Sequence, residues 1–185
     1  METGQLVAAL ATGVHADRVL FQPHDVSPYE CDGLTMFKAK PKVVVLPETR
    51  DEVCHVVRTC KALGVPVVAR GAGTGLSGGA LPHAEGVLLV MAKFNRILDV
   101  DADARIARVE PGVRNLAISE AVSDLNLYYA PDPSSQIACS IGGNIAENSG
   151  GVHCLKYGLT VHNVLSSNAM VIDRTLCTVK PYFKQ

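Results

Sequence analysis

The stretch from Gly64 to Pro82 decides the fold, and it reads G-V-P-V-V-A-R-G-A-G-T-G-L-S-G-G-A-L-P. Its valine-rich part, Pro66 to Arg70, predicts a buried strand. Glycine recurs directly after that strand, from Gly71 to Gly79. Because glycine tolerates positive φ angles, consecutive backbone N–H groups in such a loop can point at one place and bind an anion. The loop therefore predicts a phosphate or pyrophosphate site, with a flexible surface loop as the alternative.

Neither standard nucleotide motif explains this loop. Gly73 to Gly78 matches G-x-G-x-x-G, but the dinucleotide-binding form of that motif needs a helix to begin within it. Pro82 and Gly86 leave no room for a helix before the next expected strand. A P-loop needs Lys and then Ser or Thr after its last glycine, where this chain has Gly79-Ala80. A less common nucleotide-binding fold is therefore favoured.

The segments before the loop predict a strand, a helix and a second strand. Lys42 to Leu46 is a β-branched run of the kind buried in parallel sheets. Thr49 and Glu52 form a capping-box signature, apolar residues then repeat at helical spacing, and Gly64 supplies a C-cap. With the strand Pro66 to Arg70, this order predicts a right-handed parallel crossover.

The rest of the chain predicts a change from parallel to antiparallel pairing. Gly86 to Ala92 is a third apolar strand, and Ile97 to Asp101 with Arg105 to Glu110 predicts a hairpin around a polar turn. Apolar spacing predicts helices over Thr3 to Leu20 and Val113 to Leu127.

A second glycine window, Pro131 to Gly151, reads P-D-P-S-S-Q-I-A-C-S-I-G-G-N-I-A-E-N-S-G-G. A short helix is expected from Gly142 to Asn148, and the free N–H groups and dipole at its start would favour an anion. Hydroxyl donors are available from Ser134, Ser135 and Ser140. Two anion-binding loops in one small domain suggest one diphosphate held from both sides. A tight turn with an Asn cap is the structural alternative for this window.

Composition excludes several classes of protein. The 17 basic and 18 acidic residues give a net charge of -1, so no basic field attracts nucleic acid or anionic lipid. The longest apolar runs, such as Val87 to Ala92, fall far short of the roughly 20 residues of a membrane span. The start of the chain does not read as a signal peptide, so a cytoplasmic location is expected. Six cysteines without a C-x-x-C pair predict reduced thiols, and neither His153 nor His162 has a partner at metal-binding spacing, so no metal is expected.

These pieces, in this order, resemble the FAD-binding domain of the FAD-linked oxidase family, whose fold is called the vanillyl-alcohol oxidase or PCMH-type fold. The resemblance is to the branch that includes glycolate oxidase flavoprotein subunits, and it covers about Pro28 to Leu165. It implies an α+β fold, in which a small parallel βαβ subdomain is followed by a subdomain with a mixed or antiparallel sheet. The segments that carry it are P-Y-E-C-D-G-L (Pro28 to Leu34), V-V-V-L-P-E-T (Val43 to Thr49), Gly64 to Pro82, V-E-P-G-V-R-N (Val109 to Asn115), and Tyr128 to Thr160, which contains the second glycine window and ends in G-V-H-C-L-K-Y-G-L-T.

The resemblance also implies FAD as cofactor and names the residues that would hold it. Some relatives attach FAD covalently through a His in the first loop, and this loop has none, so the resemblance implies non-covalent binding. The cofactor-binding residues implied are Arg70, Gly71, Ala72, Gly73, Thr74, Gly75, Leu76, Ser77 and Gly78 around the pyrophosphate, and Pro131, Asp132, Ser134, Gly142, Gly143, Asn144, Asn148, Gly150, Gly151, Tyr157 and Gly158 on the other side of the cofactor and toward the flavin.

The chain departs from the family near its end. Further strands and a substrate domain are expected after Thr160, but Ser166 to Gln185 diverges and keeps only a weak strand, turn, strand pattern at Ala169 to Asp173 and Leu176 to Val179. We therefore expect an N-terminal helix and connector over 1–40, an incomplete FAD-binding domain over 41–165 and a divergent tail over 166–185. Truncation or a frame change is the favoured explanation, and a specialised short protein is the alternative. No catalytic residue can be carried over.

The family reaction implies the function of the whole protein. A 2-hydroxy acid such as glycolate or D-lactate is oxidised to the keto acid by hydride transfer to the flavin, and other subunits of a glycolate oxidase complex are implied as partners. Whether this chain is itself an enzyme stays open. The alternatives are a non-catalytic truncated FAD-binding remnant and a nucleotide-binding module for another ligand.

Overall fold

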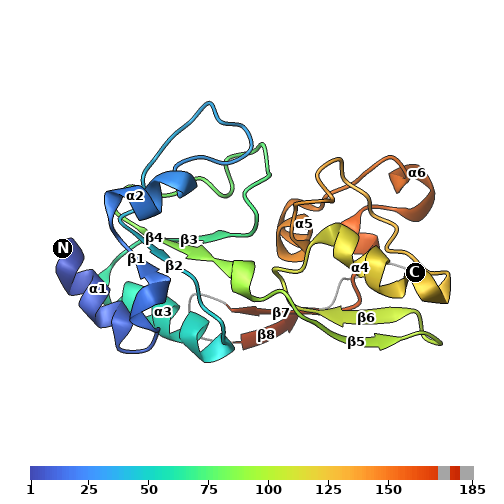
Figure 1. Cartoon of the computed structure of the whole chain (residues 1–185), viewed down its shortest axis with the longest axis horizontal. Helices are drawn as coiled ribbons and strands as arrows, with labels where there is room; N and C mark the ends of the chain where they lie inside the picture. The colour runs from blue at the N-terminus through green and yellow to red at the C-terminus, as the bar shows by residue number, and fades with distance from the viewer. Residues whose placement is uncertain (171–175, 180–185) are drawn as a thin grey trace. The chain divides into compact units, whose positions relative to one another are not determined.

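The computed structural model describes residues 1–170 and 176–179 and divides the chain into two compact units (Figure 1). The first unit is Met1–Phe94, and the second comprises the described residues from Asn95 onward. A mixed sheet lies in the first unit and antiparallel hairpins lie in the second, so the predicted α+β class is confirmed. The boundaries predicted at 40/41 and 165/166 stay a prediction.

The sheet of the first unit has the order β1-β2-β4-β3. Its strands are β1 (Val19–Leu20), β2 (Val43–Val45), β3 (Val67–Arg70) and β4 (Val87–Val90). Strands β2 and β3 both run parallel to β4, whereas β1 is antiparallel to β2. The predicted parallel arrangement is confirmed, with β4 inserted between the two strands that the crossover connects. The glycine-rich loop therefore begins at the carboxyl end of β3.

Helices cover both faces of this sheet (Figure 1). On one face α1 (Thr3–Ala11) and α3 (Arg50–Leu63) pack on β2 and β4 through a core of buried residues that includes Leu6, Leu10, Val43, Val45, Val56 and Val87. On the other face α2 (Pro23–Val26) and the 3-10 turn η2 (Ser27–Tyr29) pack on the alternate side chains, among them Val44 and Leu88. Both faces of β2 and β4 are buried, as their unbroken apolar sequences require.

The start of the chain corrects one prediction. The helix expected over Thr3 to Leu20 ends at Ala11, and a 3-10 turn η1 (Ala16–Arg18) and β1 follow. Gly13 follows the helix end, and a Cβ on it would collide with the ring of His55 on α3. The backbone therefore turns where it approaches α3 closely, although Val14 and Val19 remain buried as the apolar pattern predicts. The sequence also did not predict α2, which lies in the connector.

The second unit is built from two hairpins and short helices. The hairpin β5 (Ile97–Asp101) and β6 (Ile106–Val109) is antiparallel, as predicted, and β7 (Ser167–Met170) pairs antiparallel with β8 (Leu176–Val179). Of the strand predicted over Ala169 to Asp173, residues 171–173 lie outside the described residues. The helices and 3-10 turns are α4 (Asn115–Val122), η4 (Ser123–Leu125), α5 (Ile141–Glu147), α6 (Cys154–Tyr157) and η5 (Thr160–Asn163), while η3 (Met91–Lys93) ends the first unit.

The helix predicted over Val113 to Leu127 is shorter than expected. Regular α-helix ends at Val122, a 3-10 turn continues to Leu125, and Asn126 then adopts a left-handed conformation with φ 54°. Val113, Ile118 and Ile141 form the buried centre of the unit, against which the hairpin residues Ile97 and Val109 pack. The apolar spacing therefore identified the buried Ile118 and Val122, but it missed the end of the helix and included Leu125, which is exposed.

Glu52 gives a testable pH dependence. Its carboxylate accepts two hydrogen bonds from Arg18, at 2.6 and 2.7 Å, and completes the capping box with Thr49 at the start of α3. The Arg18 hydrogen bond outweighs burial, so the pKa of Glu52 lies below its usual 4.5. A lowered folded-state pKa means that this stabilisation is fully present above pH 4.5 and is lost as the pH falls through the lowered value.

Replacing Glu52 with glutamine should therefore lower the free energy of unfolding at pH 7 by about 1–2 kcal/mol and flatten its decline below pH about 4.5. Urea unfolding at a series of pH values measures both effects. Glu2→Gln is the matched control, because Glu2 is exposed and makes no side-chain cap for α1. An acid profile of Glu52→Gln that superimposes on that of the unmodified chain would contradict this role.

Candidate functional site

The glycine-rich loop after β3 presents consecutive backbone amides. Within the described part of the chain, the N–H groups of Ala72–Leu76 have no hydrogen-bond partner. Gly73 and Gly78 adopt positive φ angles of 74° and 79°. Unpaired backbone donors cost free energy unless water or a ligand binds them, so this loop has the donor set of an anion site.

Residues 32–34, which follow η2, brace the glycine-rich loop through hydrogen bonds, and the sequence did not predict these contacts. In Figure 1 the segment that follows α2 runs beside the loop that follows β3, and the Gly33 amide donates to the Gly75 carbonyl at 3.0 Å. The Asp32 carboxylate accepts from the amides of Leu34 at 3.0 Å and Gly78 at 2.9 Å. Because Asp32 is only 6% exposed, these bonds fix the far end of the loop. The P-Y-E-C-D-G-L motif was the available signal for this segment, but nothing in it indicated which residue would act.

Close contacts explain why some loop positions are glycine. A Cβ on Gly73 would collide with the Arg70 guanidinium, and its φ of 74° disfavours any other residue. A Cβ on Gly33 would come within 2.6 Å of the Thr74 carbonyl oxygen. The loop and its brace therefore approach each other at backbone distance.

Arg70 holds the base of the loop. Its guanidinium donates to the carbonyls of Cys31 at 2.7 Å and Ala80 at 3.2 Å, and it lies over the Tyr29 ring at 5.8 Å from the centroid. Arg70 is 9% exposed, and burial lowers its pKa. These contacts tie the segment before the loop to the loop itself. The contact between Arg70 and a phosphate therefore stays a prediction.

The start of α5 corrects the interpretation of the second window. The Gly142 amide was expected to be free for an anion, but it donates to the Pro111 carbonyl at 2.8 Å, and the preceding Ile141 amide donates to the Val113 carbonyl at 2.8 Å. A Cβ on Gly142 would lie 2.8 Å from the Cβ of Pro111. The Gly142 amide therefore holds α5 against the segment that contains Pro111, and it is not free to bind an anion.

Buried polar atoms without partners lie in the same window. The Ser140 hydroxyl and the Asn144 Nδ2 are buried and make no hydrogen bond in the described part of the chain, and both residues are at most 5% exposed. The Tyr129 hydroxyl is a third such atom, and burial raises the pKa of Tyr129 to about 12. Such atoms are costly unless a ligand or further polypeptide satisfies them. They are the polar groups in this unit best suited to contact a bound molecule.

Most of the remaining predicted residues between positions 131 and 158 have structural contacts. Pro131 accepts a bond from the buried Asn115 amide at 2.9 Å, and Asn148 caps α5 with φ 49° while its Oδ1 accepts from the Val161 amide at 3.0 Å. Ser134 is exposed, and a Cβ on Gly143 would meet only the Ser140 Oγ at 3.5 Å. A Cβ on each of three other glycines would collide with a neighbour, and these are Gly150 against Leu159, Gly151 against Asp132 and Gly158 against His162. Close packing therefore explains why these three positions are glycine.

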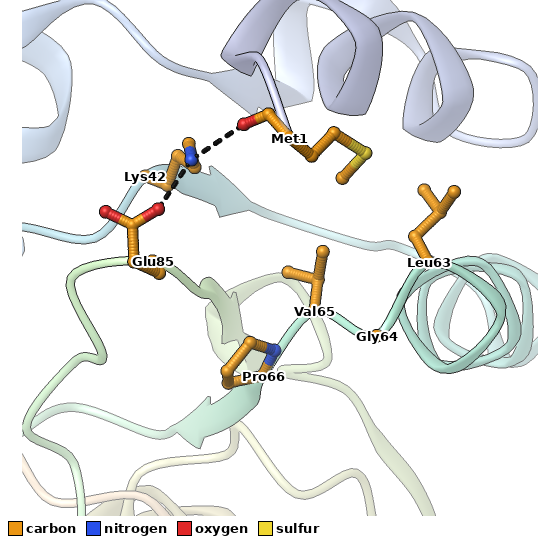
Figure 2. A pocket seen from close by; sticks show the side chains of 7 residues that line it. All are labelled: Met1, Lys42, Leu63, Gly64, Val65, Pro66 and Glu85. Carbon is orange, nitrogen blue, oxygen red and sulfur yellow. Dashed lines mark hydrogen bonds and ion pairs between the residues drawn. The ribbon is translucent and has the colours of Figure 1, made fainter.

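A small cavity of the first unit lies elsewhere. Its volume is about 140 Å³, and Met1, Lys42, Leu63, Val65 and Glu85 are among its lining residues (Figure 2). The Lys42 ammonium donates to the Met1 carbonyl at 2.9 Å and to the Glu85 carboxylate at 2.7 Å. The charge of Lys42 is therefore already paired, which makes this cavity a poor anion site.

Two further features are absent from the described residues. No group of three or more His, Cys, Asp or Glu side chains there is arranged to hold a metal ion. No helix among them has the length and apolar character needed to cross a membrane.

Comparison with known proteins identifies the domain. Residues 41–179 match the sequence profile of the FAD binding domain family. The chain belongs to this family. The match includes the glycine-rich loop with its free amides and the buried polar atoms of the second window, and FAD is the cofactor that such a domain binds.

Several relatives are similar to this chain over most of its length. It is 58% identical over 174 residues to the glycolate oxidase subunit GlcD of Escherichia coli K12, which covers 94% of this chain and 35% of that protein. It is 42% identical to the GlcD subunit of Bacillus subtilis, over 78% of this chain and 31% of that protein. It is 40% identical to a D-lactate dehydrogenase of Archaeoglobus fulgidus, over 74% of this chain and 30% of that protein. The chain thus spans about a third of the length of these relatives.

Solved structures show the same fold. An alkyldihydroxyacetonephosphate synthase superimposes with a TM-score of 0.84 at 20% identity, over 97% of this chain and 35% of that one. A p-cresol methylhydroxylase superimposes with a TM-score of 0.78 at 20% identity, over 95% of this chain and 35% of that one. The predicted PCMH-type fold is confirmed.

Proposed function

We propose that this chain is the FAD-binding portion of a flavin-dependent dehydrogenase or oxidase that converts a 2-hydroxy acid, of the glycolate or D-lactate type, to the keto acid. The family match supports FAD, and the names of the similar glycolate oxidase subunits and D-lactate dehydrogenase support the substrate class. The single structural observation that carries the proposal is the run of amides at Ala72–Leu76, which have no hydrogen-bond partner among the described residues.

The residues present fit the cofactor. A pyrophosphate carries the negative charge that a loop of unpaired amides binds, and positive φ angles at Gly73 and Gly78 shape that loop. In the second unit the Ser140 hydroxyl and the Asn144 Nδ2 are buried and have no partner among the described residues. They are therefore available for hydrogen bonds to polar atoms of such a ligand. We propose that the other residues implied by the resemblance also line the cofactor. Because Gly71–Ala80 contains no His, Cys or Tyr, the proposal includes non-covalent binding.

Bound FAD would supply the acceptor for the hydride, and the polypeptide would bind, orient and shield it. Asp32 and Arg70 hold the loop from outside, so its amides are fixed before a ligand arrives. Such preorganisation reduces the conformational entropy that binding must overcome. The small acid substrate, partner subunits of a glycolate oxidase complex and a cytoplasmic location belong to the same proposal.

A non-catalytic FAD-binding role is the second candidate, because the chain spans only 35% of a relative that carries the activity in its name. The two candidates share cofactor binding and differ in turnover. Titration of the purified chain with FAD, followed by flavin absorption and fluorescence, should show saturable binding. Dye reduction that depends on glycolate or D-lactate would then support the enzyme, and binding without reduction would support the second candidate. A chain that takes up no FAD would contradict both.

A further inference from the structure

A cluster of ionisable side chains surrounds α6 in the second unit. It comprises His153 at the start of α6, Lys156 and Tyr157 in its last turn, Tyr128 before the second glycine window, and Asp132 inside that window. We refer to these residues as the His153 cluster.

Asp132 holds the imidazole of His153 in one orientation. Its Oδ2 lies 2.6 Å from Nδ1 of His153, and its Oδ1 accepts the backbone amide of the same residue at 3.2 Å. Burial opposes the charged form of Asp132, but the hydrogen bonds from His153 outweigh it and the pKa of Asp132 is lowered. With Nδ1 donating to this carboxylate, the other ring nitrogen, Nε2, is on the opposite edge of a side chain that is 57% exposed.

Lys156 and His153 both contact the ring of Tyr157. The Lys156 ammonium lies 4.9 Å from the ring centroid, and the His153 ring lies 6.4 Å from it. Tyr128 packs edge-on against the same ring at 6.0 Å. Lys156 forms no ion pair with a carboxylate in the described part of the chain, and the Asp132 carboxylate of the cluster pairs with His153. The cluster therefore presents an unneutralised cation and an oriented imidazole around one aromatic ring.

We propose that His153 and Lys156 bind the carboxylate of a small organic acid, with Asp132 as the positioning residue for the imidazole. A carboxylate accepts charge-assisted hydrogen bonds from an ammonium and from an imidazole, and the short apolar part of the acid can lie on the Tyr157 ring. The inference deepens the proposed function, because the acid bound here would be the 2-hydroxy acid that the flavin oxidises. The groups in contact with His153 are the Asp132 carboxylate and the Tyr157 ring, and Tyr128 and Lys156 in turn contact that ring.

The test uses the FAD-free chain, glycolate as the probe and the ring proton resonances of histidine in NMR spectra. The His153 resonance is identified by its absence from the spectrum of His153→Gln. It should shift saturably with glycolate, and Lys156→Gln should weaken that binding about tenfold or more, the loss expected for one charge-assisted hydrogen bond. Asp132→Asn should weaken it severalfold although both donors remain. Lys40→Gln and His24→Gln are matched controls, because Lys40 is exposed and His24 is an exposed imidazole beside Asp25, at 3.5 Å.

Two results would overturn the inference. One is a His153 resonance that does not respond to glycolate, or responds equally in Lys156→Gln. The other is displacement of glycolate by inorganic phosphate, with the same loss of phosphate binding in the variants, which would assign the cluster to a phosphate. FAD binding is measured separately by flavin fluorescence, so loss of cofactor binding alone would contradict the proposed function and leave acid binding intact.

Discussion

Replacing Gly73 with alanine is expected to weaken FAD binding by roughly a hundredfold, the equivalent of losing one or two hydrogen bonds to a charged group. A left-handed conformation costs a residue with a Cβ about 1–2 kcal/mol, and this Cβ would also collide with the Arg70 guanidinium. The loop must therefore move, and the amides of Ala72–Leu76 lose their common direction. Quenching of flavin fluorescence during titration with the variant measures the affinity.

Gly64→Ala is the matched control for this prediction. Gly64 has a similar φ of 65°, but its Cβ would meet nothing within 4 Å and it caps α3 instead of shaping the loop. The control should lose about 1 kcal/mol of stability to urea and keep its affinity for FAD. Equal FAD affinities of Gly73→Ala and the unmodified chain would show that the loop conformation does not govern binding.

Replacing Asp32 with alanine is expected to lower the free energy of unfolding by about 3 kcal/mol and to weaken FAD binding about tenfold. The change leaves the amides of Leu34 and Gly78 without their buried acceptor and releases one end of the loop. Urea unfolding measures the first effect, and flavin titration of the folded variant measures the second.

Asp32→Asn is the graded comparison, because its side chain keeps one acceptor oxygen for two amides. It should fall between the unmodified chain and Asp32→Ala in both measurements. If Asp32→Ala were as stable as the unmodified chain and bound FAD as tightly, the brace would have no part in the site.

Local signals in the sequence predicted the elements whose ends they specify. The bounds of α3, Arg50–Leu63, follow from the Thr49 and Glu52 capping box and the Gly64 cap, all of which the structure contains. The first helix was predicted too long, since apolar spacing continues through Val14 and Val19 although the backbone turns at Gly13 to approach α3. A close approach between distant segments leaves no local pattern from which to predict it.

In the candidate site, too, the features set by local sequence were predicted and those set by distant contacts were not. Glycine spacing was enough to predict the amide-rich loop after β3, because the conformation of such a loop is a local property of its residues. The Asp32 brace depends on a contact across 46 positions of sequence, between Asp32 and Gly78. In the second window the prediction of a free amide at Gly142 was wrong, because this amide donates to the Pro111 carbonyl.

The most direct test of cofactor binding at the loop is an amide NMR spectrum of the ¹⁵N-labelled chain recorded with and without FAD. The amides of Ala72–Leu76 should show the largest shift changes in the first unit and should saturate at one FAD per chain. FAD binding that leaves these resonances in place, or no binding at all, would contradict the account.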